Sequence, residues 1–165
     1  MAQKADCTEN KPVREDLANE DVIEVHTVQS VLSRTSQPFR TTVKLIDNDR
    51  KETEFINAIV DDGAMVAAID TGLYEKLRKK IDGWGRSTRR MRMANGELVL
   101  AEATWTGKVQ LKGLEVDGSF EVFDSGGSWQ LLFGKPLLEQ FKAVHEYTTD
   151  TIKVSDGKTA RTVFN

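Results

Sequence analysis

The chain has 165 residues, of which 39% are hydrophobic and 30% are charged, and its formal net charge at pH 7 is -3. This length and composition predict one globular domain with a real hydrophobic core, rather than a disordered chain. The negative charge gives no reason to expect nucleic-acid binding, and the single cysteine, Cys7, excludes an internal disulfide and a thiolate metal site.

Residues 1–21 are polar and rich in charge, and they show no periodicity of apolar residues. We expect them to form a flexible polar arm, followed by a folded domain over residues 22–165. The start of the chain has no secretory signal, and no long apolar run occurs in it. The expected protein is therefore intracellular and cytoplasmic, with no membrane partner.

Alternating apolar residues predict two strands in the first part of the domain, over Phe39–Ile46 and Glu54–Val60, joined by a polar turn at Asp47–Arg50. A further strand or short helical segment is expected over residues 22–31. The two strands form a hairpin that leads into the sequence AIVDDGA, residues 58–64. A strand that delivers an acidic residue, Asp61, into a glycine turn is one half of the arrangement that an aspartic protease requires.

The next segment predicts a short strand at Met65–Ile69 and a helix over Leu73–Ile81, with Asp70 or Thr71 as the N-cap. Two strand-like runs follow, Arg89–Met93 and Leu98–Leu111, on either side of Asn95-Gly96. This dipeptide predicts a long hairpin closed by a type I′ turn, in which both central residues have positive φ.

Leu114–Phe123 predicts two more strands around an Asp117-Gly118 turn, and Asp124–Ser128 is a glycine-rich loop. A second strand with a glycine turn follows, formed by Leu131, Leu132, Phe133 and Gly134, and Pro136 begins a short helix after it. The last strands are expected over residues 143–147, 151–154 and 159–164, the latter two as a terminal hairpin. The predicted fold class is all-β, a small barrel-like domain with two short helices.

Three motifs, VDDGA, RMANGELV and LLFGKPLL, occur in this order, and together they resemble those of retropepsin-type aspartic proteases encoded by gypsy-like LTR retrotransposons. The resemblance covers Phe39 to Val154. It implies a retropepsin-like barrel with one lobe per chain, an active symmetric homodimer, and an extended peptide or polyprotein substrate. It implies no cofactor and no metal. Asp61 would be the catalytic residue in a turn completed by Asp62, Gly63 and Ala64, and the Ala94–Gly96 hairpin tip would be a flap over bound peptide.

Two other triplets spell the common Asp-Thr/Ser-Gly form, Asp70-Thr71-Gly72 and Asp124-Ser125-Gly126. Asp61 is favoured because it follows a full apolar strand, whereas Asp70 precedes a helix that it can cap, and Asp124 lies in a loop sequence. Asp61 and Asp124 are 124 − 61 = 63 residues apart. Because this is too short for a complete second lobe, a second copy of the chain has to complete the site.

Asp62 departs from the pattern of the family that this sequence resembles, in which Thr or Ser at this position normally exchanges hydrogen bonds with the partner loop. An ionised Asp accepts such a bond but does not donate one. It also brings four carboxylates close to the dimer axis, where like charges favour protonation. We expect at least one Asp62 to be protonated or turned outward, and activity to be confined to acidic pH. Met65 is a second departure, at a position where many viral members carry Asp.

Two other interpretations remain open on the sequence alone. The chain can be a catalytically weak or inactive module that keeps this fold for dimerisation or peptide binding. It can also be a domesticated relative that resembles the ubiquitin-shuttle proteases, although no ubiquitin-like segment is present. His26 and His145 lack metal-ligand spacing and are read as surface or satisfied structural histidines, and Trp105 is read as a core residue.

Overall fold

The structure is a computed structural model that describes residues 36–165. The predictions for the arm over residues 1–21, for the segment 22–31, and for Cys7 and His26 concern residues outside this part of the chain. Residues 38–165 form one compact unit. Within residues 36–165, no helix is long and apolar enough to cross a membrane.

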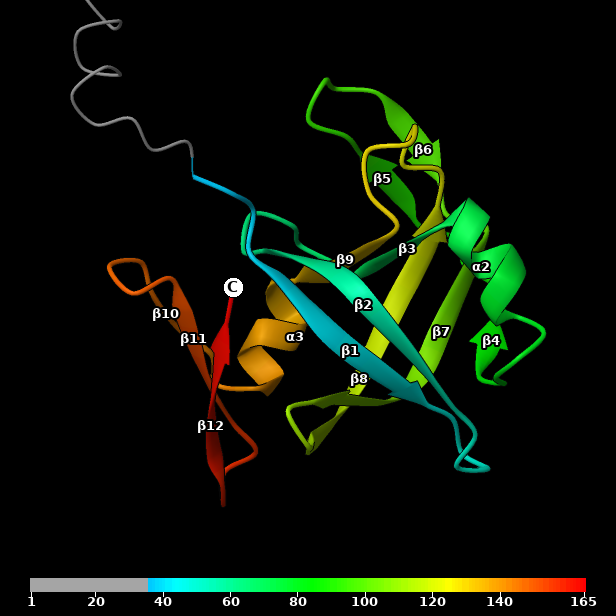
Figure 1. Cartoon of the computed structure of the whole chain (residues 1–165). Coiled ribbons are helices and arrows are strands. Elements are labelled where there is room, and N and C mark those ends of the chain that lie inside the picture. Colours follow the sequence, from blue (N-terminus) through cyan, green and yellow to red (C-terminus); the bar gives the residue numbers. More distant parts are fainter. Residues whose placement is uncertain (1–35) are drawn as a thin grey trace, which may run out of the picture. The chain divides into compact units, whose positions relative to one another are not determined.

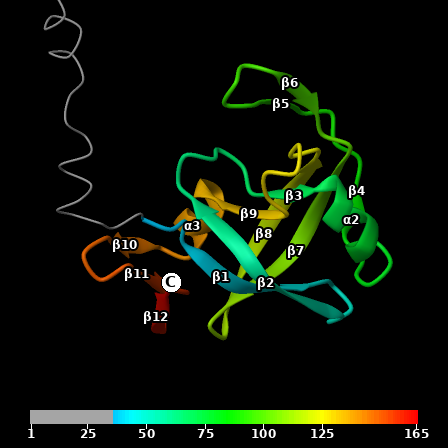
Figure 2. The same cartoon turned by 45° about the horizontal axis from the view of Figure 1, so that its top comes forward.

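The unit is built around a sheet that closes on itself (Figures 1 and 2). Seven strands follow the order β1-β2-β9-β3-β8-β7-β4, and an additional pairing of β1 with β7 closes six of them into a barrel. This confirms the predicted all-β barrel with two short helices. The strands are β1 (Arg40–Ile46), β2 (Glu52–Asp61), β3 (Ala68–Asp70), β4 (Trp84–Gly85), β7 (Ala103–Leu111), β8 (Leu114–Phe123) and β9 (Leu131–Gly134).

The predicted first hairpin is present as β1 and β2, which pair in antiparallel register. Asp47 holds the turn between them, because its buried carboxylate accepts hydrogen bonds from the backbone N–H groups of Asp49 and Lys51, each at 2.9 Å. It also accepts a 2.9 Å bond from the N–H of Asp82. These bonds hold the pKa of Asp47 below its usual value, and the bond from the N–H of Asp82 has the largest effect.

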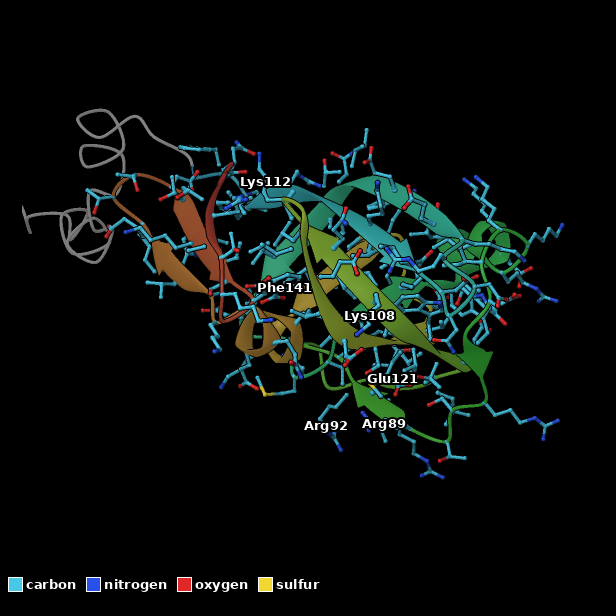
Figure 3. The ribbon with its side chains drawn as sticks, turned by 90° about the horizontal axis from the view of Figure 1, so that it is seen from below. Arg89, Arg92, Lys108, Lys112, Glu121 and Phe141 are labelled. Atoms are coloured by element: carbon cyan, nitrogen blue, oxygen red, sulfur yellow. The ribbon has the colours of Figure 1, made fainter. Side chains whose placement is uncertain are left out.

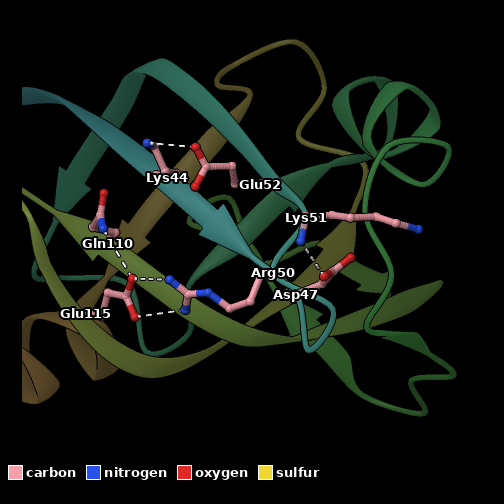
Figure 4. Close-up of polar contacts among 7 residues, drawn as sticks. All are labelled: Lys44, Asp47, Arg50, Lys51, Glu52, Gln110 and Glu115. Carbon is pink, nitrogen blue, oxygen red and sulfur yellow. Dashed lines mark hydrogen bonds and ion pairs between the residues drawn. The ribbon is translucent and has the colours of Figure 1, made fainter.

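The close-up in Figure 4 shows ion pairs around this hairpin. Lys44 pairs with Glu52 at 3.0 Å, and Arg50 makes two bonds to Glu115, at 3.1 and 2.9 Å. All four side chains keep contact with solvent. Solvated pairs of this kind contribute little to stability, so the backbone bonds of the turn are the stronger constraint on the hairpin.

The turn predicted at Asp117-Gly118 is wrong, because these residues lie inside a strand of the β7–β8 hairpin. The turn lies at Lys112 and Gly113, which have φ values of 50° and 80° as a type I′ turn requires, and β8 runs unbroken from Leu114 to Phe123. Gly118 lies inside β8, opposite Gly107. It serves close packing rather than a turn, because an added Cβ would lie 2.6 Å from a methyl carbon of Val109.

The Asn95-Gly96 hairpin is also present, but with shorter strands and another turn than predicted. β5 (Arg90–Arg92) pairs with β6 (Leu98–Leu100). Gly96 has a φ of 85°, whereas Asn95 is not left-handed, and the N–H of Gly96 donates to the carbonyl of Met93 at 2.9 Å. This is a longer loop that ends in a left-handed glycine, not a type I′ turn.

The predicted strand over residues 98–111 is interrupted because its backbone changes partners. The N–H of Ala101 donates to the carbonyl of Arg89, and the next N–H, of Glu102, donates to the carbonyl of Val122 in β8. Beyond this point β7 belongs to the barrel. Glu121, also in β8, ties the base of the hairpin down, because its buried carboxylate lies 3.4 Å from Nε of Arg89 (Figure 3).

Two helices and a small sheet complete the unit. α2 (Thr71–Leu77) follows the predicted N-cap Asp70 and is shorter than expected. The strand before it, β3, covers residues 68–70, whereas a strand was expected over 65–69. α3 (Lys135–Gln140) follows β9 directly and has Pro136 in its first turn, as predicted. The chain ends in an antiparallel sheet of β10 (Val144–Glu146), β11 (Thr151–Ser155) and β12 (Ala160–Phe164).

Large aromatic side chains belong to the main hydrophobic core. Trp105, Phe120, Phe133 and Phe141 are almost completely buried. Trp105 is a core residue, as predicted, and its indole N–H donates to the carbonyl of Asp82 at 2.8 Å. Because the ring lies next to the β7 backbone, a Cβ on Gly107 would lie 2.5 Å from the Trp105 ring and 2.7 Å from the carbonyl oxygen of Ile46.

Gly107→Ala is therefore expected to destabilise the protein by about 1–3 kcal/mol, as overpacking of a filled core does. Gly85→Ala is the matched control, because a Cβ there would meet only Thr104, at the ordinary contact distance of 3.7 Å. Urea unfolding of the two variants and the parent measures the difference. Equal midpoints for the two variants would contradict the packing that we describe around Trp105.

Candidate active site

Asp61 is the last residue of β2, and β2 lies beside β9 in the barrel. The two strands are parallel, with Asp61 opposite Gly134, although more than seventy residues separate them in the sequence. The two predicted strand-and-glycine-turn segments, 58–64 and 131–134, are thus neighbours in space. Because parallel strands bring the same ends to one edge of a sheet, both glycine turns lie at that edge.

The backbone of the first turn holds the carboxylate of Asp61. The N–H of Gly63 donates to Oδ1 of Asp61 at 2.9 Å, and the N–H of Ala64 donates to the carbonyl of Asp61 at 3.3 Å. The side chain of Asp61 is half-buried. A carboxylate held by one backbone donor and still open to solvent can bind a water molecule.

Gly134 locks the two turns together. An added Cβ at this position would lie 2.0 Å from the carbonyl oxygen of Val66, so only glycine allows this approach of the two backbones. The next residue, Lys135, donates its N–H to the carbonyl of Ala64 at 2.9 Å. Gly134 itself is not left-handed, so it is close packing rather than backbone conformation that requires glycine here.

Asp62 is exposed and follows Asp61 in the same turn. In the described part of the chain, its side chain makes no hydrogen bond or ion pair within the subunit. Asp61 and Asp62 line one groove of about 500 Å³ together with residues of α3 and β10. The lining residues include Phe39, Lys135, Leu138, His145 and Tyr147.

Sequence reasoning missed this groove, because its other residues come from segments without a recognisable motif. His145 in particular is not the surface or satisfied histidine that was expected. It is half-buried, its ring lies 4.1 Å from that of Tyr147, and its Nε2 is buried with no hydrogen-bond partner in the described residues. Oδ1 of Asp150 lies 3.8 Å from this nitrogen, beyond hydrogen-bond distance.

The two rival aspartates have local structural contacts instead. Asp70 caps α2 by accepting the N–H of Gly72 at 2.9 Å, and it also accepts the N–H of Ser125 at 2.8 Å. Burial of the Asp70 carboxyl opposes its ionisation, but the bonds from Ser125 and Gly72 outweigh this and hold its pKa below the usual value. Asp124 is exposed and accepts the N–H of Gly126 at 2.8 Å, which closes a local turn.

The predicted flap residues Ala94, Asn95 and Gly96 form the exposed tip of the β5–β6 hairpin. The inward side chains of this hairpin, Met91, Met93 and Val99, belong to a second apolar cluster around Phe123 and Leu132. Residues 36–165 contain no group of three or more His, Cys, Asp or Glu side chains that could hold a metal ion.

Because the ionised form of Asp70 accepts both backbone bonds, we expect Asp70→Asn to lower the free energy of unfolding by about 1 kcal/mol at neutral pH. The folded-state pKa of Asp70 is depressed, so this contribution is present above the unfolded pKa and is lost as the pH falls through the folded pKa. Urea titrations of parent and variant at neutral pH and in acid below the usual aspartate range measure it. A difference that stays the same in acid would contradict the assignment.

No protein-family model and no curated sequence matches this chain. Solved structures do match. The retroviral protease-like domain of Ddi1 from Leishmania major aligns with a TM-score of 0.52 at 14% identity, over 78% of this chain and 96% of that domain.

The protease of EIAV, solved in complex with the inhibitor HBY-793, also aligns with a TM-score of 0.52. Its sequence identity to this chain is 18%, and the alignment covers 68% of this chain and 96% of the EIAV chain. Both matches span 96% of the other chain, which in the case of Ddi1 is one domain. The described part of this chain therefore has the fold of the retropepsin-type aspartic proteases.

Proposed function

We propose that this chain is an aspartic endopeptidase that acts as a symmetric homodimer. The observation that carries this proposal is the place of Asp61, at the end of β2 and beside Gly134, with a half-buried carboxylate that keeps a single backbone donor. The fold shared with the EIAV protease supports the same conclusion. Of the three Asp-x-Gly turns in the chain, only this one ends a barrel strand beside the second glycine turn.

In the proposed reaction, one Asp61 comes from each subunit, and the two carboxyl groups share a proton and hold one water molecule. The ionised carboxylate takes a proton from the water, whose oxygen attacks the peptide carbonyl carbon. The protonated carboxyl gives its proton to the carbonyl oxygen, and a tetrahedral diol forms. The C–N bond then breaks as its nitrogen takes the proton that the first carboxylate removed from the water, while a diol hydroxyl returns a proton to the second carboxylate. The products are a free carboxyl and a free amine.

The substrate in this proposal is an extended peptide, bound by strand-like hydrogen bonds between the Asp61 turn and the β5–β6 hairpin. The hairpin tip, Ala94–Gly96, acts as a flap that excludes water from the bound peptide. The sequence resemblance to gypsy-like elements supports a retroelement polyprotein as the natural substrate.

The second candidate is a catalytically weak or inactive module that dimerises or binds peptides. Asp62 favours it, because an exposed carboxylate here lacks the hydroxyl proton that would bond to the partner loop. Four carboxylates near a two-fold axis also repel one another, so they oppose the association that the reaction requires.

Asp61→Asn is expected to lower peptide cleavage by about a thousandfold, the scale on which a positioned acid or base contributes. A mixed peptide library assayed from about pH 3.5 to 7.5 measures this. Asp49→Asn is the matched control, because Asp49 is an exposed residue in the β1–β2 turn. This variant should cleave peptides like the parent. Undiminished cleavage by Asp61→Asn would exclude Asp61, and a folded dimer that cleaves nothing would favour the binding module.

Asp62→Thr removes two of the four carboxylates near the axis and supplies a hydroxyl donor for the partner loop. We expect tighter dimerisation and an activity optimum about one pH unit higher than that of the parent, because less protonation is needed to relieve repulsion. Sedimentation equilibrium and pH–rate profiles measure the two effects. A parent profile that stays flat up to neutrality would contradict this role of Asp62.

A further inference from the structure

A second groove lies between the β5–β6 hairpin and the loop that follows β8. Its volume is about 690 Å³, and its walls come from hairpin residues 93–95 and 97–100 and from the loop residues Asp124, Ser125, Gly126 and Ser128. We call it the hairpin groove. It is distinct from the groove that Asp61 and Asp62 line.

The hairpin side of the groove offers exposed apolar surface beside a free strand edge. Leu98 and Leu100 are 54% and 68% exposed, and Met93 and Val99 also line the groove. In the described residues β6 pairs only with β5, so its other edge has no strand partner. An extended peptide can add to such an edge and place an alkyl chain against the leucines.

The two charged residues that line the hairpin groove, Glu97 and Asp124, are both acidic and exposed. Glu97 comes from the hairpin and Asp124 from the loop. Neither has an ion-pair partner in the described residues. The basic residues of the same hairpin, Arg90 and Arg92, do not line the groove. A guanidinium nitrogen of Arg92 donates a hydrogen bond to the carbonyl oxygen of Gly96 at 3.3 Å.

The loop wall of the groove is held in place by contacts outside the groove. Ser125 is buried, its N–H donates to Asp70, and its hydroxyl donates to the carbonyl of Trp129 at 2.8 Å. The ring of Trp129 packs edge-on against Phe123, with a centroid distance of 5.3 Å. The loop therefore presents the carboxylate of Asp124 in one place, and a fixed carboxylate binds a cation at a lower entropic cost than a mobile one.

We propose that the hairpin groove selects peptide substrates that carry a lysine or arginine side chain. The alkyl stem of that side chain lies against Leu98 and Leu100, and its charged head binds Asp124 and Glu97. This combination of an apolar wall and carboxylates at its end matches a long basic side chain better than an apolar or acidic one. The proposal rests on the proposed function and names the substrate class of the same enzyme.

The test uses fluorescein-labelled dodecapeptides of neutral residues, in which one position at a time holds Lys, Arg, norleucine or Glu. Norleucine keeps the alkyl stem of lysine without its charge. At one position we expect kcat/KM to be about fivefold higher for Lys or Arg than for norleucine, the ratio that a partly solvated ion pair supports. In Asp124→Asn this ratio should fall toward one, because Asn keeps the local turn but loses the charge.

Glu97→Gln is expected to reduce the same ratio, and Asp117→Asn is the control that should keep it, because Asp117 is an exposed residue of β8 that does not line the groove. Raised salt should also weaken the preference for Lys and Arg. The position at which Asp124→Asn changes the preference identifies the peptide residue that the groove binds.

Fluorescence anisotropy with the same peptides and Asp61→Asn separates binding from catalysis. If Lys and Arg peptides bind more tightly than the others, and Asp124→Asn abolishes this difference, the groove proposal is supported even when the parent cleaves nothing. Absence of cleavage by the parent would overturn only the proposed function. Equal binding and equal cleavage of all four peptides, or a preference for Glu, overturns the groove proposal and leaves the endopeptidase intact.

Discussion

The parallel pairing of β2 with β9 is the constraint on which the candidate site depends. It places Asp61 opposite Gly134 and brings two backbone turns so close that a single Cβ on Gly134 would overlap the carbonyl of Val66. The N–H of Lys135 then bonds to the carbonyl of Ala64, which links the start of α3 to the Asp61 turn. Backbone contacts between two distant segments thus fix the position of the Asp61 turn, and the N–H of Gly63 holds one carboxylate oxygen of Asp61.

Similar aspartates have different tasks in this chain because their hydrogen-bond donors differ. Asp47 accepts three backbone bonds and holds the first hairpin, and Asp70 accepts two and joins α2 to the loop after β8. Asp61 accepts one and remains open to solvent. A carboxylate that accepts several backbone bonds is held in its ionised form and serves stability, whereas one with a single backbone donor and access to solvent can hold water and exchange a proton.

The same loop contacts connect the fold to the proposed specificity. Asp70 fixes Ser125, and Ser125 in turn fixes the loop that presents Asp124 to the hairpin groove. On the other side of the groove, the buried carboxylate of Glu121 holds the hairpin base through Arg89. A groove between two anchored walls binds a peptide without first having to order them, which favours selectivity.

Local patterns in the sequence determined much of the structure. Alternation of apolar residues predicted β1 and β2, and a short apolar run before Gly134 predicted β9. The N-cap at Asp70 predicted the start of α2, and Pro136 predicted the start of α3, because each depends on neighbours within a few residues. The motifs and their order also pointed to the barrel fold and to Asp61 as the candidate catalytic residue, an assignment that stays a prediction.

Only the tertiary structure decided features that depend on distant neighbours. Gly118 reads as a turn in the sequence, but it is a packing residue because β7 and α3 approach it, and the turn falls at Lys112-Gly113 instead. The strand after the hairpin breaks where its backbone leaves Arg89 for Val122. Both grooves were missed for the same reason: their walls come from segments far apart in the chain, and no local pattern records which of these will meet.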